Sequence, residues 1–487
     1  MTQIVGDWDV AKNWINGEWT DSPVHADSID PATGEVIGTY ASATRSDVKR
    51  AIQVAKRAFD TTAWRADRRL RARVLNAMAD RVEARQQDLI DLLSLDNGKV
   101  KGEAALEIGL VPSKLRYNAA LGLSESGRAA EVLPGRVSLV LREPMGVAGV
   151  ITPWNSPIVL SIRSLAPALA AGCTAVVKMP EQTAQINRLF MEVIGQTEGL
   201  PPGVLNIFTA DRDAAAAIIE SPDVPAISFT GSTATGKAIS ATGAASLKRF
   251  GLELGGKTPM ILFESADLAE AVPVLEKALT VFAGQFCMTG SRLLVHRSIA
   301  DKVRSQLRKR LEAVNPGPAA DPAVDMGPMI DGANVARVNA LVDAAIKQGA
   351  RAVVRGGPVT DGPLAAGAFY RPTLLEVDDN SLPIVQEEVF GPVLTMQVFD
   401  TEAEAIALAN DSKYGLAASV WSRDVDQPLR VARELQVGTV WVNDWAKVYD
   451  EFEEGGYKES GQGRLNGLAA LEDFLEYKHI ALHPGTV

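Results

Sequence analysis

Two different spacings of hydrophobic residues follow one another along the chain. Residues 13–40 alternate polar and apolar positions around turn sequences such as Asn-Gly and Asp-Pro, which indicates short strands. Apolar residues at helical spacing then predict helices over 46–59, 65–87 and 101–121. This first region is therefore expected to combine short strands with a group of helices.

Beyond this region, short apolar runs dominate the pattern. They predict strands at 137–142 and 146–151, and then strands separated by helices at 174–178, 204–208, 226–229 and 249–252. A second alternating run fills 258–443, with strands expected at 259–262, 292–296, 352–355, 393–399, 416–421 and 439–442. Strands that alternate with helices at this spacing form parallel sheets covered on both faces. We therefore expect an α/β fold with two doubly wound parallel-sheet domains.

The composition agrees with a folded protein of more than one domain. The 487 residues exceed the size of a single hydrophobic core, and 46% hydrophobic with 22% charged residues is typical of globular proteins. The net charge of −11 argues against nucleic acid or an anionic membrane as partner. Residues 1–9 lack the basic start and apolar core of a signal peptide, and the longest apolar run, 165–177, is too short to span a bilayer.

Two sequence features bear on the compartment and on nucleic acid. The chain has only two cysteines, so no disulfide framework is implied and a cytoplasmic location is expected. The arginines of 65–73 resemble a nucleic-acid patch in isolation, but Asp67, Asp80 and Glu83 lie nearby in an acidic chain. We therefore interpret the arginines as a solvated helix face.

The stretch 251–292 carries the clearest candidate chemistry. Glu253 lies in Leu-Glu-Leu-Gly-Gly-Lys, and Cys287 lies in Gly-Gln-Phe-Cys-Met-Thr-Gly-Ser-Arg. Glycines let the backbone approach a ligand closely, and a thiol becomes a strong nucleophile only as thiolate. Glu253 can take the thiol proton or activate a water afterwards. A buried structural cysteine beside a strand-end glutamate is the alternative, but it leaves the Gly-Gly pair and the polar residues after the thiol unexplained.

Three further motifs stand where expected strands end. Gly231 and Ser232, in Phe-Thr-Gly-Ser-Thr-Ala-Thr-Gly, precede a helix whose N-terminus can receive a pyrophosphate, although an ordinary capped turn explains them equally well. Lys-Met-Pro-Glu at 178–181 ends a parallel strand, where open α/β sheets bind ligands. Asn155, in Pro-Trp-Asn-Ser-Pro, can donate to a developing oxyanion together with the backbone N–H of Cys287, or it belongs to a helix-capping turn.

Glu-Leu-Gly-Gly-Lys followed by Gly-Gln-x-Cys at this offset resembles the NAD(P)-dependent aldehyde dehydrogenase superfamily. The resemblance runs from Trp-Ile-Asn-Gly at 14–17 to Gly-Gly-Tyr-Lys-Glu-Ser-Gly at 455–461, with the motifs in the order of the family. It implies that Cys287 attacks an aldehyde carbon, that hydride passes to NAD, and that water activated by Glu253 hydrolyses the thioester. The catalytic residues implied are Cys287, Glu253, Asn155 and Lys178.

The same resemblance assigns the cofactor residues. Lys178 and Glu181 hold the adenosine ribose, and NAD is expected over NADP because the Glu181 carboxylate would repel a 2′-phosphate. Glu388 holds the nicotinamide ribose and Phe390 packs beside the nicotinamide ring, whereas a surface glutamate pair before a turn is the alternative. The cofactor residues implied are Thr152, Trp154, Lys178, Glu181, Gly231, Ser232, Leu254, Glu388 and Phe390.

The substrate side departs from the family pattern. Ser156 replaces an aromatic residue, and Glu453-Glu454 replace a proline and an aromatic residue. Arg163 lies two helical turns after Asn155, so it can face the same tunnel, paired with a substrate carboxylate or hydroxyl or with Glu454. A structural ion pair facing away is the alternative. The expected substrate residues, Arg163, Phe286, Met288 and Glu454, leave a semialdehyde and an aromatic or polar aldehyde open.

The resemblance also implies a domain organisation. We expect an NAD-binding domain over 1–122 and 144–254, a catalytic domain over 255–459, and a β oligomerisation element over 123–143 and 460–487, in a homodimer or homotetramer. A CoA-acylating dehydrogenase is the alternative within the fold, although that branch commonly lacks the glutamate. A cofactor-independent thiol esterase and a silent NAD-binding protein are alternatives from other classes. No histidine lies in a motif with the thiol, which argues against a Cys-His hydrolase and a metal centre.

Overall fold

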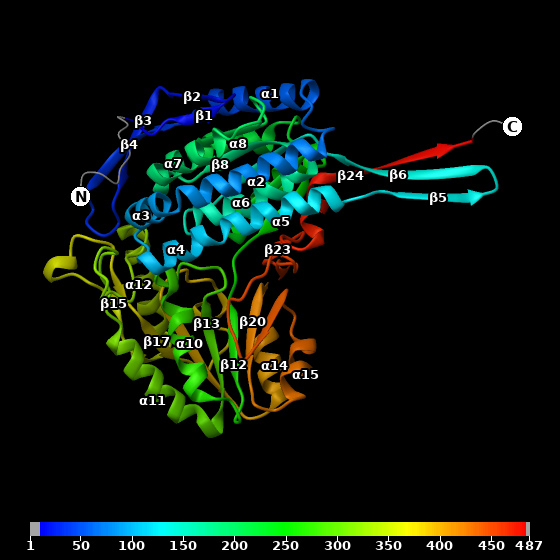
Figure 1. Ribbon diagram of the computed structural model, residues 1–487. Helices are drawn as coiled ribbons and strands as arrows, with labels where there is room; N and C mark the ends of the chain where they lie inside the picture. Colours follow the sequence, from blue (N-terminus) through cyan, green and yellow to red (C-terminus); the bar gives the residue numbers. More distant parts are fainter. Residues whose placement is uncertain (1–9, 484–487) are drawn as a thin grey trace.

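The computed structural model describes residues 10–483, so the expectation about residues 1–9 lies outside the described part of the chain. Two α/β units, each a sheet covered by helices, lie one above the other, and a three-stranded β arm projects from the side of the molecule (Figure 1). One unit is built on an eight-stranded sheet and the other on a seven-stranded sheet. The α/β fold with parallel sheets, expected from the hydrophobic pattern, is confirmed.

The eight-stranded sheet has the order β2-β1-β9-β8-β7-β10-β11-β23. Its strands are β1 Asn13–Ile15, β2 Glu18–Thr20, β7 Val147–Ile151, β8 Thr174–Met179, β9 Leu205–Thr209, β10 Ala226–Thr230, β11 Arg249–Glu253 and β23 Gly461–Gln462. The five strands from β9 to β11 are parallel. Alternate residues of β7 enter different cores: Ala148 and Val150 pack with one group of helices, and Val147 and Ile151 with another. Burial on both faces explains why these strands are apolar throughout.

Helices cover both faces of this sheet. On one face lie α2 Arg68–Ala84, α3 Gln86–Asn97, α4 Lys101–Gly109, α5 Val111–Ser124, α6 Pro157–Ala171 and α7 Ala184–Gly195. On the other lie α1 Arg45–Thr61 and α8 Arg212–Glu220, and α9 Thr233–Gly243 follows β10. The single helix expected over 101–121 is divided in two, and the helix expected over 65–87 ends at Ala84 and is followed by α3, which the sequence pattern did not predict. Pro112 stands in the first turn of α5, where its missing N–H costs no hydrogen bond, so the chain restarts a helix there.

One of the arginines at 65–73 is not solvated. Arg71 is buried, and its guanidinium donates to the carbonyls of Ala170 at 3.0 Å, Trp64 at 2.8 Å and Arg65 at 3.0 Å. The interpretation of the whole run as a solvated helix face is therefore wrong for Arg71. A buried cation is tolerated here because its donors are satisfied by backbone oxygens.

The seven-stranded sheet has the order β14-β17-β18-β13-β12-β20-β21. Its strands are β12 Thr258–Leu262, β13 Gly290–His296, β14 Arg351–Val354, β17 Thr373–Glu376, β18 Val393–Phe399, β20 Ala417–Trp421 and β21 Thr439–Val442. The helices of one face are α10 Leu268–Thr280 and α11 Arg297–Ala313, and those of the other are α14 Glu402–Asn410 and α15 Gln427–Glu434. Beside them lie α12 Gly332–Lys347 and α13 Pro383–Gln386.

The arm consists of β5 Arg128–Leu133, β6 Arg136–Pro144 and β24 Leu475–Leu482, all antiparallel. Figure 1 shows the arm extending away from both α/β units. The segment expected over 460–487 is divided between two sheets, because β23 pairs with β11 whereas β24 pairs with β6. Small pairs complete the fold: β3 Val24–Ile29 with β4 Val36–Ser42, β15 Gly357–Pro358 with β16 Tyr370–Arg371, and β19 Tyr414–Gly415 with β22 Tyr457–Lys458. Between residues 10 and 483, no helix is both long and apolar enough to cross a membrane.

Candidate active site

The carboxyl ends of four neighbouring parallel strands meet at one edge of the eight-stranded sheet. The register aligns Ile151 with Lys178 and Thr230 with Glu253. Thr152 continues β7 and donates its hydroxyl to the carbonyl of Lys178 at 3.0 Å. The strand ends singled out in the sequence therefore form one continuous edge, which is where open α/β sheets bind ligands.

The Gly-Gly pair after β11 brings the glutamate and the thiol together. A Cβ on Gly256 would lie 2.5 Å from the carbonyl oxygen of Cys287, so no side chain fits between the two loops. Ser460 holds the loop in place by donating its hydroxyl to the carbonyl of Gly255 at 2.7 Å. Glu253 itself is buried at the end of β11. The need for glycine in this motif thus follows from close backbone approach.

The segment before the thiol has an unusual backbone. Phe282, Ala283 and Gly284 have φ values of 52°, 52° and 72° in succession, in the left-handed region that only glycine adopts without strain. The side chain of Gln285 secures this turn, because its Nε2 donates to the carbonyl of Phe282 at 2.9 Å and its Oε1 accepts from the N–H of Ile330 at 2.9 Å. A tightly held turn therefore presents Cys287.

Desolvation disfavours the charged forms of both reacting groups. Desolvation raises the pKa of Cys287 to about 12, although the nearby Arg163 guanidinium opposes the rise. Desolvation also raises the pKa of Glu253 to about 8, again opposed by Arg163. A thiol in this state needs a base to become a nucleophile, and a carboxyl group with a pKa near neutrality can accept a proton and release it again.

Asn155 is buried directly beside the turn over 282–285 that precedes Cys287. Its Nδ2 donates to the carbonyl of Gln285 at 3.0 Å. A side-chain amide carries two N–H groups, and this bond uses one of them. The contact fixes the amide two residues before Cys287, while the role of Asn155 toward an oxyanion stays a prediction.

Glu181 is held by two residues that sequence reasoning missed. Its Oε1 accepts hydrogen bonds from the hydroxyls of Tyr40 at 3.1 Å and Ser42 at 3.2 Å, both on β4. Desolvation lowers the pKa of Lys178 to about 8, against the opposing charge of Glu181. No motif marks Tyr40 or Ser42, because an alternating strand says nothing of which distant carboxylate it will meet.

The remaining cofactor candidates lie around the same edge. Ser232 caps α9 by accepting from the N–H of Thr235 at 3.3 Å, and Gly231 follows β10 directly. Glu388 accepts from the N–H of Gly256 at 3.2 Å, and desolvation raises its pKa to about 7.

Aromatic and apolar side chains complete this set. The rings of Trp154 and Phe390 pack edge to face with centroids 5.5 Å apart. Phe390 has a φ of 51°, a strained conformation typical of functional sites. Leu254 is buried beside the glutamate.

The expected substrate residues also gather near the thiol. Phe286 packs against Trp445 with ring centroids 5.9 Å apart, and Trp445 Nε1 donates to the carbonyl of Met288 at 2.9 Å. Arg163 Nη1 lies 2.9 Å from Glu454 Oε1, and both side chains are buried. The sequence left three partners open for Arg163: a substrate carboxylate, a substrate hydroxyl and a protein acid. The structure shows the protein acid, Glu454.

A second buried ion pair, which sequence reasoning missed, packs against the start of α6 and the turn before the thiol. Lys99 pairs with Glu107 and donates to the hydroxyl of Ser156 at 3.0 Å, while its ammonium lies 4.0 Å from the ring centroid of Phe282. Glu107 in turn accepts from the N–H of Ile158 at 2.9 Å, at the start of α6. This cluster joins the start of α6 to the turn before the thiol.

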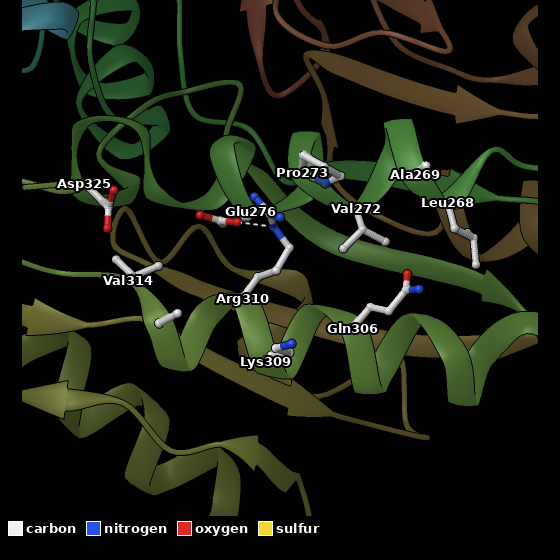
Figure 2. A pocket seen from close by; sticks show the side chains of 11 residues that line it. Leu268, Ala269, Val272, Pro273, Glu276, Gln306, Lys309, Arg310, Val314 and Asp325 are labelled. Carbon is white, nitrogen blue, oxygen red and sulfur yellow. Dashed lines mark hydrogen bonds and ion pairs between the residues drawn. The ribbon is translucent and has the colours of Figure 1, made fainter.

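A surface pocket of about 510 Å³ lies elsewhere, between α10 and α11. Figure 2 shows its lining, with the ion pair of Glu276 and Arg310 at its centre. None of the candidate residues belongs to it. Over residues 10–483, no group of three or more histidine, cysteine or acidic side chains is placed to hold a metal ion.

Comparison with known proteins identifies the family. Residues 19–480 match the family model described as the aldehyde dehydrogenase family. The chain belongs to the aldehyde dehydrogenase family. The superfamily and the enzyme class expected from the thiol, glutamate and glycine motifs are thereby confirmed.

Similar proteins cover almost the whole chain. A betaine aldehyde dehydrogenase of Bacillus subtilis is 37% identical over 472 residues, 96% of each chain. A hydroxyisobutyraldehyde dehydrogenase of Mycolicibacterium austroafricanum is 37% identical over 96% of this chain and 93% of its own. The crystal structure of a betaine aldehyde dehydrogenase from Staphylococcus aureus in complex with NAD+ is 36% identical, with a TM-score of 0.96 over 100% of this chain and 97% of that one.

Proposed function

We propose that this protein oxidises an aldehyde to a carboxylic acid with NAD as hydride acceptor. The observation that carries the proposal is the contact between the glutamate loop and the thiol loop, where Gly256 leaves no space for a side chain beside Cys287. Glu253 ends β11 at the sheet edge where Lys178 lies near the end of β8 and Glu181 follows that strand. A related enzyme has been crystallised with NAD+, which supports the choice of cofactor.

Each chemical step is assigned to particular residues of the site. Cys287, once deprotonated, attacks the aldehyde carbon, and the oxyanion of the thiohemiacetal lies against Asn155 and the backbone N–H of Cys287. NAD, when bound, accepts the hydride. Glu253 then takes a proton from the water that hydrolyses the thioester, which releases the acid and restores the thiol.

The contacts at the sheet edge fit a dinucleotide. Lys178 and Glu181 are proposed to hold the adenosine ribose and Glu388 the nicotinamide ribose. Gly231 directly precedes Ser232, the N-cap of α9, and a helix N-terminus can receive phosphate. Arg163, Phe286, Met288 and Glu454 are proposed to line the substrate path.

NADH absorbance with an aldehyde separates this function from the alternatives. Equal rates with and without CoA are expected, because Glu253 is present to activate water. A rate that depends on CoA would identify an acylating enzyme instead. Ester hydrolysis in the absence of NAD, without any NADH formation when NAD is added, would identify a thiol esterase.

Replacing Glu181 by serine should raise the NADP/NAD ratio of kcat/KM. The carboxylate accepts hydrogen bonds from Tyr40 and Ser42, so it is fixed where a 2′-phosphate would meet its charge. Steady-state kinetics with both cofactors measure the ratio. Glu198→Ser, which removes an exposed carboxylate at the far end of the same βα unit, is the control. An unchanged ratio in Glu181→Ser would mean that specificity is set elsewhere.

We also propose a homodimer or homotetramer in the cytoplasm, assembled through the arm. Val132, Leu133 and Leu141 are exposed apolar residues on β5 and β6, and exposed apolar patches mark association surfaces. Sedimentation velocity should therefore give a dimer or a tetramer at micromolar concentration. A stable monomer at that concentration would contradict the proposal.

A further inference from the structure

The ion pair of Arg163 and Glu454 joins two segments that are distant in sequence. It lies on the side of the site where we propose that the substrate binds. Arg163 comes from α6 and Glu454 from the segment after β21, and their side chains are only 4% and 8% exposed. Arg163 Nη1 donates to Glu454 Oε1 at 2.9 Å, and Nη2 donates to the hydroxyl of Thr230 at 3.2 Å. Thr230 is aligned with Glu253 across the sheet, so the guanidinium is anchored beside the proposed base.

Glu454 is held on both of its oxygens. Its Oε2 accepts from Asn466 Nδ2 at 3.1 Å, and Asn466 Oδ1 accepts from Lys114 Nζ at 3.1 Å. Lys114 is paired in turn with Asp450 at 2.7 Å. The carboxylate therefore stays in place against Arg163, because a buried network with satisfied partners holds one arrangement.

The charges of this network balance in pairs. Glu454 neutralises Arg163, and Asp450 neutralises Lys114. A second carboxylate brought by a substrate would meet the carboxylate of Glu454, which already occupies the guanidinium of Arg163. Like charges at close range in a buried site are strongly unfavourable.

One N–H group of Arg163 takes no part in these pairs. Among the residues that the structure describes, the buried Nε of Arg163 has no hydrogen-bond partner. A buried donor without an acceptor costs about 1–3 kcal/mol, which an oxygen atom of a ligand can recover. Because Glu454 already neutralises the guanidinium, an uncharged acceptor such as a hydroxyl oxygen can satisfy this donor.

We propose that Glu454 occupies the place of a substrate carboxylate, so that the enzyme selects uncharged, oxygen-bearing aldehydes and rejects carboxylated ones. This substrate class rests on the proposed function. The family comparisons include relatives named for a cationic and for a hydroxylated aldehyde. The neutralised arginine favours the hydroxylated class, and a cationic substrate is an outcome of the test.

The wild-type enzyme is tested first with aldehydes of one chain length. Butyraldehyde, γ-hydroxybutyraldehyde and succinic semialdehyde differ only at the far end, and betaine aldehyde adds a cation. The kcat/KM of γ-hydroxybutyraldehyde should exceed that of succinic semialdehyde by about tenfold or more. A semialdehyde oxidised as well as the hydroxyaldehyde, or a preference for betaine aldehyde, would overturn the proposal. Failure to oxidise any of the four would instead count against the proposed function.

The Glu454→Gln variant then tests the carboxylate directly. It keeps the side-chain shape but leaves the charge of Arg163 without its partner. The kcat/KM ratio of succinic semialdehyde to butyraldehyde should rise by about tenfold or more. Glu451→Gln removes the same charge from an exposed position of the same segment and should leave the ratio unchanged.

A double variant, Arg163→Met with Glu454→Leu, guards against a packing effect. Replacing a buried ion pair by apolar residues of similar volume is often neutral for stability, so this variant is suitable if Glu454→Gln fails to fold. Its semialdehyde ratio should stay low, and its preference for γ-hydroxybutyraldehyde over butyraldehyde should disappear. An unchanged ratio in folded Glu454→Gln, an equal rise in Glu451→Gln, or an undiminished hydroxyl preference in the double variant would overturn the inference.

Discussion

Cys287→Ala is expected to abolish NADH formation, whereas Cys173→Ala should retain most of the wild-type activity. Only a thiolate sulfur can form the thiohemiacetal, and alanine supplies no nucleophile in its place. Absorbance at saturating aldehyde and NAD measures both variants. Loss of activity in Cys173→Ala with activity retained in Cys287→Ala would reverse the assignment.

Cys173 is a suitable control because its surroundings are structural. It is fully buried in the core between the sheet and its helices, and its Sγ lies 3.4 Å from the carbonyl oxygen of Phe474. Burial raises the pKa of this thiol to about 11. Removing it leaves a small cavity and costs stability, so thermal melting of both variants separates a folding defect from a catalytic one.

Glu253→Gln should keep the first burst of NADH but slow steady turnover by about 10²-fold or more, the usual scale of losing a general base. The glutamine fills the same volume but cannot take a proton from water, so the thioester accumulates. Rapid mixing of enzyme, NAD and aldehyde resolves the burst from the steady rate. A variant without a burst would assign Glu253 to activation of the thiol instead.

The pH dependence of turnover gives a second readout of the same residue. Burial raises the pKa of Glu253 to about 8, so the ionised form that acts as a base becomes more abundant as pH rises through this value. Turnover of the wild-type enzyme should therefore increase across that range. The Glu253→Gln variant should lack this limb of the profile, because its side chain does not titrate there.

The sequence by itself determined the architecture and the reacting groups. Continuous apolar strands alternating with helices require burial on both faces, which only a covered parallel sheet provides. Parallel strands all end at one edge, so the motifs after β7, β8, β10 and β11 had to meet. Gly255 and Gly256 are recognisable because a close backbone contact excludes every other residue, and Cys287 stands out because the chain has only two thiols. Each of these requirements restricts a residue type or a spacing, and a sequence records both.

Only the tertiary structure decided which charged side chains meet. The partners of Glu181 lie about 140 positions away on β4, and Glu454 lies 291 positions from Arg163. In the sequence, a charged side chain that folding will bury looks the same as one that stays in solvent, as the buried Arg71 demonstrates. The reason is physical: a charge can be buried only where folding delivers its partner, and neither spacing nor composition records that distance. The substrate choice that we propose rests on one such pair, so it follows from the tertiary structure.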